Sequence, residues 1–254
     1  MRRSNLAVFF TVIAVLGLIV FTTLYFTSSQ KSVKGAGDAE LFEKNGFSAV
    51  VIKPEKALEM LQAGNRRYAT EVRLKDPGVS RNARKILLKG QAPFATILAC
   101  ADSRFPPELF FDAGLGQLFV VRNAGNQLFP DTLGSIEYAS LYSTSRLIVV
   151  MGHQSCGAIT EAARFMRQPE NGATPALNSI VCTLIPAVLI AGKKDLNISE
   201  DKLIDDAVKE NVRMVCRAIL QSSEPLRKMS ASGKLKIVGA YADLDSGKIE
   251  FFQP

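Results

Sequence analysis

The chain has 254 residues, of which 47% are hydrophobic and 22% charged, a composition that suits one folded domain with some additional length. It excludes collagen-like proteins and disulfide frameworks, since only four residues are cysteine. Lysine and arginine outnumber aspartate and glutamate by 31 to 24, but they form no basic run and the chain has no tryptophan, so we expect no nucleic-acid partner.

The first predicted element is an apolar segment near the N-terminus. Residues Leu6 to Phe26 are 21 positions without a charged side chain, enough to cross the roughly 30 Å core of a bilayer. A cleavable signal peptide usually has a shorter apolar run with a small-x-small site directly after it. We therefore expect a membrane anchor over residues 1–27, with a removed signal peptide as the alternative. Arg2 and Arg3 favour a cytoplasmic N-terminus, which places the following domain outside the cytoplasm, in the periplasm of a bacterium.

The folded domain is expected over residues 50–254, after a linker. Residues 28–49 contain serine, glycine and charged residues without sustained apolar periodicity, which predicts this linker. Helical spacing predicts a first helix over 54–68, with proline at its entry. Further helices are predicted over 132–142, 158–166 and 201–220.

Three short apolar runs separate these helices, at residues 94–99, 118–121 and 147–151. Runs without polar alternation are typical of parallel strands that are covered on both faces. Residues 236–244 and 248–252 predict a closing hairpin. The predicted fold is therefore an α/β domain with a central, mainly parallel β-sheet flanked by helices.

Two clusters of chemically distinctive residues follow two of these strands. The first strand ends in Cys100-Ala101-Asp102-Ser103-Arg104 and the third in Gly152-His153-Gln154-Ser155-Cys156-Gly157. Because the carboxyl ends of parallel strands face one crevice, both clusters can form one site. Two thiolates and one imidazole suit zinc, and three protein ligands with an open fourth position are the catalytic arrangement. Either cluster alone also fits buried cysteines and a hydrogen-bonded histidine, but the adjacent charged pair favours a site.

With these motifs the chain resembles the β-class carbonic anhydrases, whose signature is Cys-x-Asp-x-Arg followed downstream by His-x-x-Cys. The resemblance covers about residues 50–254. It implies that one zinc ion per subunit is held by Cys100, His153 and Cys156. It further implies that Asp102 and Arg104 form a catalytic dyad beside the metal. The substrate-binding positions that the resemblance implies are Gln91, Phe119, Tyr138 and Gly157.

The activity implied by the resemblance is the reversible hydration of carbon dioxide to bicarbonate and a proton. Zinc-bound hydroxide attacks the carbon of CO₂, while Asp102 orients the hydroxide and Arg104 holds the carboxylate in place. In part of the family the aspartate instead ligates zinc in an inactive state, and the sequence leaves both states open. Because His153 is the only histidine in the chain, the proton must leave through buffer or a water chain.

Alternatives to this activity remain open on the sequence alone. They are a hydrolase of CS₂ or COS on the same zinc fold, and a non-catalytic, zinc-stabilised interaction protein tethered to a membrane. The family also implies a homodimer or a higher even oligomer, with the active cleft near the subunit interface.

Four further residues carry separate expectations. Cys182 and Cys216 lie in apolar, helix-like surroundings and are predicted to be buried thiols, with a disulfide as the alternative. Family members with an inhibitory bicarbonate site have a tryptophan where this chain has Ile97, so we do not expect that regulation. Arg122, at the position of that site's arginine, is interpreted as structural.

Overall fold

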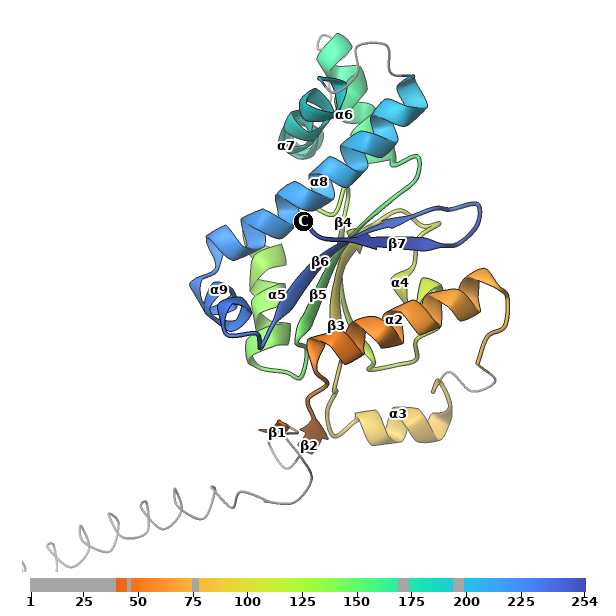
Figure 1. Ribbon diagram of the computed structural model, residues 1–254, viewed down its shortest axis with the longest axis vertical. Helices are drawn as coiled ribbons and strands as arrows, with labels where there is room; N and C mark the ends of the chain where they lie inside the picture. The colour runs from red at the N-terminus through yellow and green to blue at the C-terminus, as the bar shows by residue number, and fades with distance from the viewer. Residues whose placement is uncertain (1–39, 45–46, 75–77, 169–173, 194–198) are drawn as a thin grey trace, which may run out of the picture. The chain divides into compact units, whose positions relative to one another are not determined.

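Figure 1 shows the computed structural model of the chain. The structure describes residues 40–44, 47–74, 78–168, 174–193 and 199–254. These residues belong to one unit of the chain, Ala39–Pro254. The segment predicted to anchor the chain, residues 1–27, and the first part of the predicted linker lie outside the described residues.

The centre of the fold is a five-stranded sheet in the order β4-β3-β5-β6-β7. Its strands are β3 (Ala95–Cys100), β4 (Leu118–Asn123), β5 (Leu147–His153), β6 (Lys236–Ala242) and β7 (Ile249–Phe252). The first three pairings are parallel and β6 pairs with β7 antiparallel, which confirms the predicted sheet and its closing hairpin. Every residue of β3 and β5 is buried, because both faces of these central strands are covered.

Helices cover both faces of the sheet (Figure 1). They are α2 (Pro54–Ala69), α3 (Arg81–Leu87), α4 (Pro107–Phe110), α5 (Pro130–Leu141), α6 (Gly157–Arg167), α7 (Pro175–Gly192), α8 (Glu200–Ser222) and α9 (Glu224–Ala231). The four predicted helices are confirmed as α2, α5, α6 and α8. Within the described residues α7 is the one helix long and apolar enough to cross a membrane, and its residues Val181, Leu184 and Val188 belong to the buried core.

The core has two parts because successive side chains of a strand point to opposite faces. In β3, Ile97 packs with α2 and Leu98 with α5, and the same alternation continues in β5. Figure 1 accordingly shows α2 on one face of the sheet and α5 with α9 on the other. The two layers fix the strands, and therefore the residues that follow their carboxyl ends.

A short antiparallel hairpin precedes α2, formed by β1 (Leu41–Lys44) and β2 (Phe47–Val50). The linker predicted over residues 28–49 did not include this hairpin. Tertiary contacts hold it: Glu40 pairs with Arg146 at 2.9 Å, and the ring of Phe47 lies so close to Gly90 that an added Cβ there would be 2.6 Å from it. These contacts join residues distant in sequence, so local periodicity gave no signal for the hairpin.

Candidate metal centre

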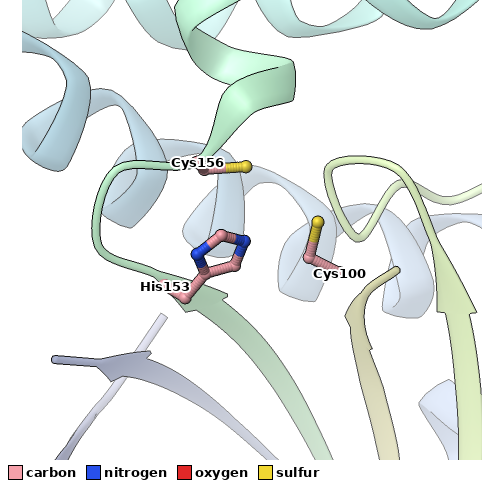
Figure 2. Close-up of side chains that lie close together, drawn as sticks. All are labelled: Cys100, His153 and Cys156. Carbon is pink, nitrogen blue, oxygen red and sulfur yellow. The ribbon is translucent and has the colours of Figure 1, made fainter. Parts of the chain in front are cut away.

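The side chains of Cys100, His153 and Cys156 point toward one another at the carboxyl end of the sheet (Figure 2). Cys100 ends β3, His153 ends β5 and Cys156 is the residue directly before α6. Their ligand atoms all lie within 4.8 Å of one another, and all three residues are buried. The structure therefore brings together the three residues that the sequence predicted as metal ligands.

The ring of His153 is oriented for metal binding. Its Nδ1 lies 2.9 Å from the carbonyl oxygen of Gln154, and because a carbonyl only accepts, Nδ1 carries the proton. Nε2 is then left with a lone pair, and within the described part of the chain this buried atom has no hydrogen-bond partner. A buried polar atom without a partner costs about 1–3 kcal/mol, so the lone pair indicates a cation between the ring and the two sulfurs.

The pKa values of the two thiols are shifted in opposite directions. A hydrogen bond from Cys156 lowers the pKa of Cys100 well below its ordinary value, against the opposing effect of burial and with smaller contributions from the amides of Gly125 and Asp102. The same contact, together with burial, raises the pKa of Cys156. A divalent cation favours both thiolates, and a set of two sulfurs and one imidazole nitrogen fits zinc.

Asp102 lies beside this cluster and is held by Arg104. The backbone N–H and the Nε of Arg104 donate to Oδ1 at 2.9 and 3.0 Å, and its Nη2 donates to Oδ2 at 2.7 Å. The guanidinium hydrogen bonds hold the pKa of Asp102 well below its usual range. Asp102 Oδ2 is 3.9 Å from His153 Nε2. Of the two states that the sequence left open, the structure thus has the carboxylate paired with Arg104.

Backbone contacts join the two ligand-bearing loops. Arg104 Nη2 also donates to the carbonyl of Ser155 at 3.3 Å. Arg122 donates through Nε to the carbonyl of Cys100 at 2.9 Å and through Nη2 to that of Asp102 at 2.7 Å. Arg122 therefore fixes the backbone on both sides of Ala101, which agrees with its interpretation as a structural residue.

The four predicted substrate-binding residues fall in two places. Gly157 is the first residue of α6, directly after Cys156, with open space where a Cβ would be. Phe119 pairs with Thr96 near the amino end of the sheet. Thr96 precedes Cys100 by four residues of β3, which is about 13 Å along the strand at 3.3 Å per residue. The ring centroid of Phe119 is 6.1 Å from that of Tyr138.

Tyr138 and Gln91 line one cavity of about 230 Å³. The β1–β2 hairpin contributes Phe42 and Phe47 to the same cavity. Within one chain, therefore, Gln91, Phe119 and Tyr138 gather away from the metal ligands. Gln91 and Tyr138 precede β3 and β5, whose far ends carry Cys100 and His153, and Phe119 lies at the start of β4 beside the start of β3.

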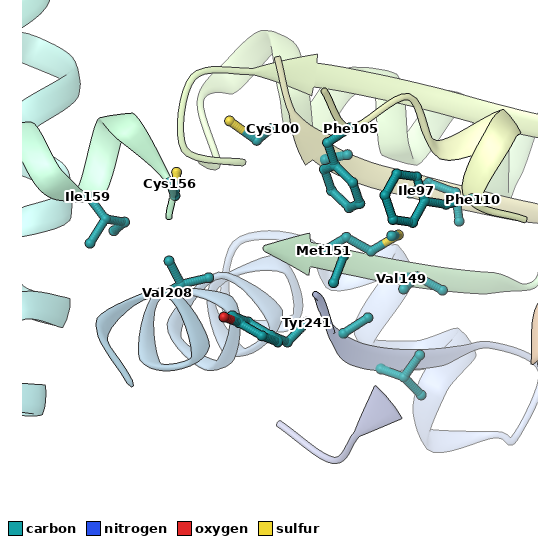
Figure 3. Packing of buried hydrophobic residues seen from close by; sticks show 14 of the residues in the cluster. Ile97, Cys100, Phe105, Phe110, Val149, Met151, Cys156, Ile159, Val208 and Tyr241 are labelled. Atoms are coloured by element: carbon teal, nitrogen blue, oxygen red, sulfur yellow. The ribbon is translucent and has the colours of Figure 1, made fainter. Parts of the chain in front are cut away.

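Two residues near the metal ligands were not predicted. The amide of Gly125 donates to Cys100 Sγ at 3.5 Å, from a backbone with φ +75° that only glycine adopts readily. The ring centroid of Phe105 is 5.2 Å from that of His153. Figure 3 shows Phe105 together with Cys100 and Cys156 in one buried apolar cluster. The sequence signal for Gly125 is a glycine that follows a strand end within two residues.

The remaining two cysteines differ in exposure. Both are free thiols, and Cys216 is buried while Cys182 is exposed. The prediction of a buried thiol is confirmed for Cys216 and wrong for Cys182, because the apolar neighbours of Cys182 occupy other faces of α7.

Comparison with known proteins gives consistent results. A protein-family model described as "Carbonic anhydrase" matches residues 95–249. Carbonic anhydrase 2 of Mycobacterium tuberculosis is 36% identical over 197 residues, which cover 77% of this chain and 91% of that protein. The carbonic anhydrase of Mycolicibacterium smegmatis is 33% identical over 199 residues, which cover 78% of this chain and 92% of that protein.

Solved structures show the same fold. A tetrameric β-carbonic anhydrase of the filamentous ascomycete Sordaria macrospora superposes with a TM-score of 0.61 at 24% identity, covering 78% of this chain and 95% of that chain. The β-carbonic anhydrase CafA of Aspergillus fumigatus gives a TM-score of 0.60 at 24% identity, with coverages of 78% and 89%.

The fold is of the α/β type, and its buried Cys-His-Cys cluster could hold a metal ion. The chain belongs to the carbonic anhydrase family. The predicted carbonic anhydrase is thereby confirmed, and its fold is that of the solved β-class structures.

Proposed function

We propose that this protein catalyses the reversible hydration of CO₂ to bicarbonate and a proton, with one zinc ion per chain held by Cys100, His153 and Cys156. The observation that carries the proposal is the unpartnered Nε2 of buried His153, which lies close to both sulfurs and 3.9 Å from the carboxylate of Asp102. Bound zinc supplies Lewis acidity, which lowers the pKa of water and makes hydroxide available near neutral pH.

Asp102 positions the attacking oxygen in this proposal. Its carboxylate is ionised because Arg104 lowers its pKa, so it only accepts hydrogen bonds. By accepting the hydroxide proton it turns an oxygen lone pair toward the carbon of CO₂. The new C–O bond forms as one C=O electron pair moves to its oxygen, which gives bicarbonate. Arg104 keeps the carboxylate in this orientation through two parallel hydrogen bonds, from Nε to Oδ1 and from Nη2 to Oδ2.

The proton that water releases needs an acceptor. The sole histidine, His153, is committed as a ligand and its Nδ1 proton is bound to the Gln154 carbonyl. Buffer or a chain of waters must therefore carry the proton away, and we expect turnover to rise with buffer concentration.

The central test is stopped-flow CO₂ hydration by the Asp102→Asn variant with zinc content measured in parallel. We expect zinc to stay bound while activity falls, because asparagine keeps the shape but presents an N–H where an acceptor is needed. Arg164→Lys is a matched control, since Arg164 pairs with Glu161 at 2.7 Å on the surface of α6. Full activity of Asp102→Asn would refute the assigned role, and wild-type turnover of CS₂ or COS without CO₂ hydration would refute the proposed substrate.

A second part of the proposal concerns the substrate pocket, which we expect a homodimer or higher even oligomer to complete. Supporting it, Gln91 and Tyr138 line a cavity away from their own chain's metal ligands, and the Sordaria relative is described as tetrameric. Chains with Cys100→Ser or Gln91→Ala can be mixed by refolding. Random pairing should restore about a quarter of the intact sites if Gln91 serves the partner's metal centre, whereas no gain over the separate variants would show that it does not.

The third part concerns placement. We propose that residues 1–27 anchor the chain and hold the enzyme outside the cytoplasm, supported by the uncharged stretch of Leu6 to Phe26. Cell fractionation with an alkaline wash should leave the full-length chain in the membrane. A soluble extracytoplasmic chain whose mass lacks these residues would identify a removed signal instead.

A further inference from the structure

The buried stripe of α8 contains one unexpected amide. Apolar residues recur on this helix at helical spacing and pack into the core: Ile204, Ala207, Val208, Val212, Val215, Cys216 and Ile219. Asn211 lies in the same stripe and is only 4% exposed. A buried amide is costly unless it is hydrogen-bonded, and an apolar residue would suit the stripe. Where a sequence breaks its own pattern, a specific contact is the expected reason.

The contact of Asn211 leads to the metal centre. Its Nδ2 donates to the carbonyl oxygen of Gly125 at 2.9 Å. Gly125 lies in the loop between β4 and α5, and its own amide donates to Cys100 Sγ at 3.5 Å. One residue therefore accepts a hydrogen bond from α8 and gives one to a metal-ligand sulfur.

The loop turns through two residues in the left-handed region. Gly125 and Asn126 have positive φ, at +75° and +44°, a backbone conformation that glycine and asparagine adopt more readily than other residues. The end of the loop is closed locally, since the amide of Gln127 donates to Asn123 Oδ1 at 2.7 Å. Gln127 Nε2 also donates to the carbonyl of Ile180 in α7 at 3.1 Å. The hydrogen bond from Asn211 is the contact that holds Gly125 itself, the residue whose amide donates to the Cys100 sulfur.

We propose that Asn211 is a positioning residue for the metal centre, which aims the Gly125 amide at Cys100 by holding the Gly125 carbonyl. An N–H donor withdraws electron density from a thiolate. The sulfur then gives less charge to the ion, which keeps more of its Lewis acidity. This inference rests on the part of the proposed function in which the cluster binds a metal, and not on the identity of the substrate.

The test uses the full chain loaded with Co²⁺ in place of zinc, so that the sulfur-to-cobalt charge-transfer band reports the sulfur directly. Asn211→Leu keeps the size of the side chain and removes the donor. We expect its band to move to lower energy, because a sulfur without its N–H donor is easier to oxidise. We also expect zinc to bind roughly tenfold more weakly in competition with a chelator.

Asn65→Leu is the matched control. Asn65 is a buried helical amide too, but its Nδ2 donates to the carbonyls of Phe110 and Gly247. Its loss should lower stability and leave both metal readouts unchanged. If Asn211→Leu does not fold, Asn211→Ala adds no bulk and gives the same readouts.

Two results would overturn the inference in distinguishable ways. If the wild-type chain gives the charge-transfer band and Asn211→Leu has the same band and a zinc affinity within twofold, Asn211 is only a packing residue. If the wild-type chain binds neither Co²⁺ nor zinc, the metal centre itself is wrong and the role of Asn211 fails with it.

Discussion

Replacing Asp112 by asparagine should destabilise the fold without changing the metal centre. Asp112 is 2% exposed and accepts from Arg67 Nε at 2.6 Å, Arg73 Nε at 2.9 Å and the amide of Leu74 at 3.1 Å. It thus joins the end of α2 to the segment after α4. Asparagine has the same shape and tolerates the left-handed backbone of residue 112, at φ +46°, so the substitution isolates the charge.

The size of the effect follows from the burial of the three groups. Removing one partner of a buried ion pair costs about 3–5 kcal/mol. The side chains of Arg67 and Arg73 are 33% and 39% exposed, so water screens both pairs and the lower limit applies, about 3 kcal/mol. For a domain of this size that corresponds to a fall in Tm of roughly 6–12 °C.

The same interaction makes the loss depend on pH. Burial raises the pKa of Asp112, but the hydrogen bonds from Arg67, Arg73 and the Leu74 amide outweigh it, so the pKa is lowered overall. A carboxyl whose folded pKa lies below its unfolded value of about 3.9 stabilises the fold fully above that value. Its contribution is lost as the pH falls through the folded pKa. The difference between wild type and Asp112→Asn should therefore be constant above about pH 5 and shrink in acid.

Denaturant unfolding of both proteins at pH 7 and at several lower pH values measures this difference. Asp206→Asn is the control, because Asp206 forms a surface pair with Lys202 at 2.8 Å, worth about 0–1 kcal/mol. A loss below 1 kcal/mol for Asp112→Asn at pH 7, or a difference that grows on acidification, would refute the reasoning.

Three further predictions concern the cysteines, the sheet and the metal. A thiol reagent should label Cys182 in the folded, zinc-loaded protein and Cys216 only after unfolding, since one is exposed and the other buried; prompt labelling of both would contradict this. Gly152→Ala should lower the free energy of unfolding by about 1–3 kcal/mol in denaturant, because the new Cβ would lie 2.3 Å from Val208 Cγ1; unchanged stability would show that α8 shifts to accommodate the methyl group without cost. Zinc at 100 times its Kd should stabilise the chain by about 2.7 kcal/mol, seen as a rise in Tm that a chelator reverses; Cys156→Ser should lose this response, and a variant that retains it would place the zinc elsewhere.

The metal ligands were predictable because their chemistry restricts the residue types. Few side chains other than cysteine and histidine suit zinc, and each ligand follows an apolar run that had to be a covered strand. The register of β3 and β5 then carries Cys100 and His153 to the same end of the sheet. The strands themselves extend beyond the predicted runs to include both ligands.

Helix α7 shows where local patterns give no signal. Its sequence is apolar on nearly every side, so it lacks the polar stripe that marks an amphipathic helix. The same uniformity hid the exposure of Cys182. Only packing against α6 and α8 decides which residues of such a helix are buried.

The sequence by itself determined the class of fold, the three ligands and the charged pair of Asp102 and Arg104, because each depends on residue type and short spacing. Tertiary structure alone decided the remaining features. It set the β1–β2 hairpin against Gly90, gathered Gln91 and Tyr138 at the end of the sheet away from the ligands, and linked Asn211 through Gly125 to Cys100. These contacts join residues far apart in the chain, and no local periodicity encodes them.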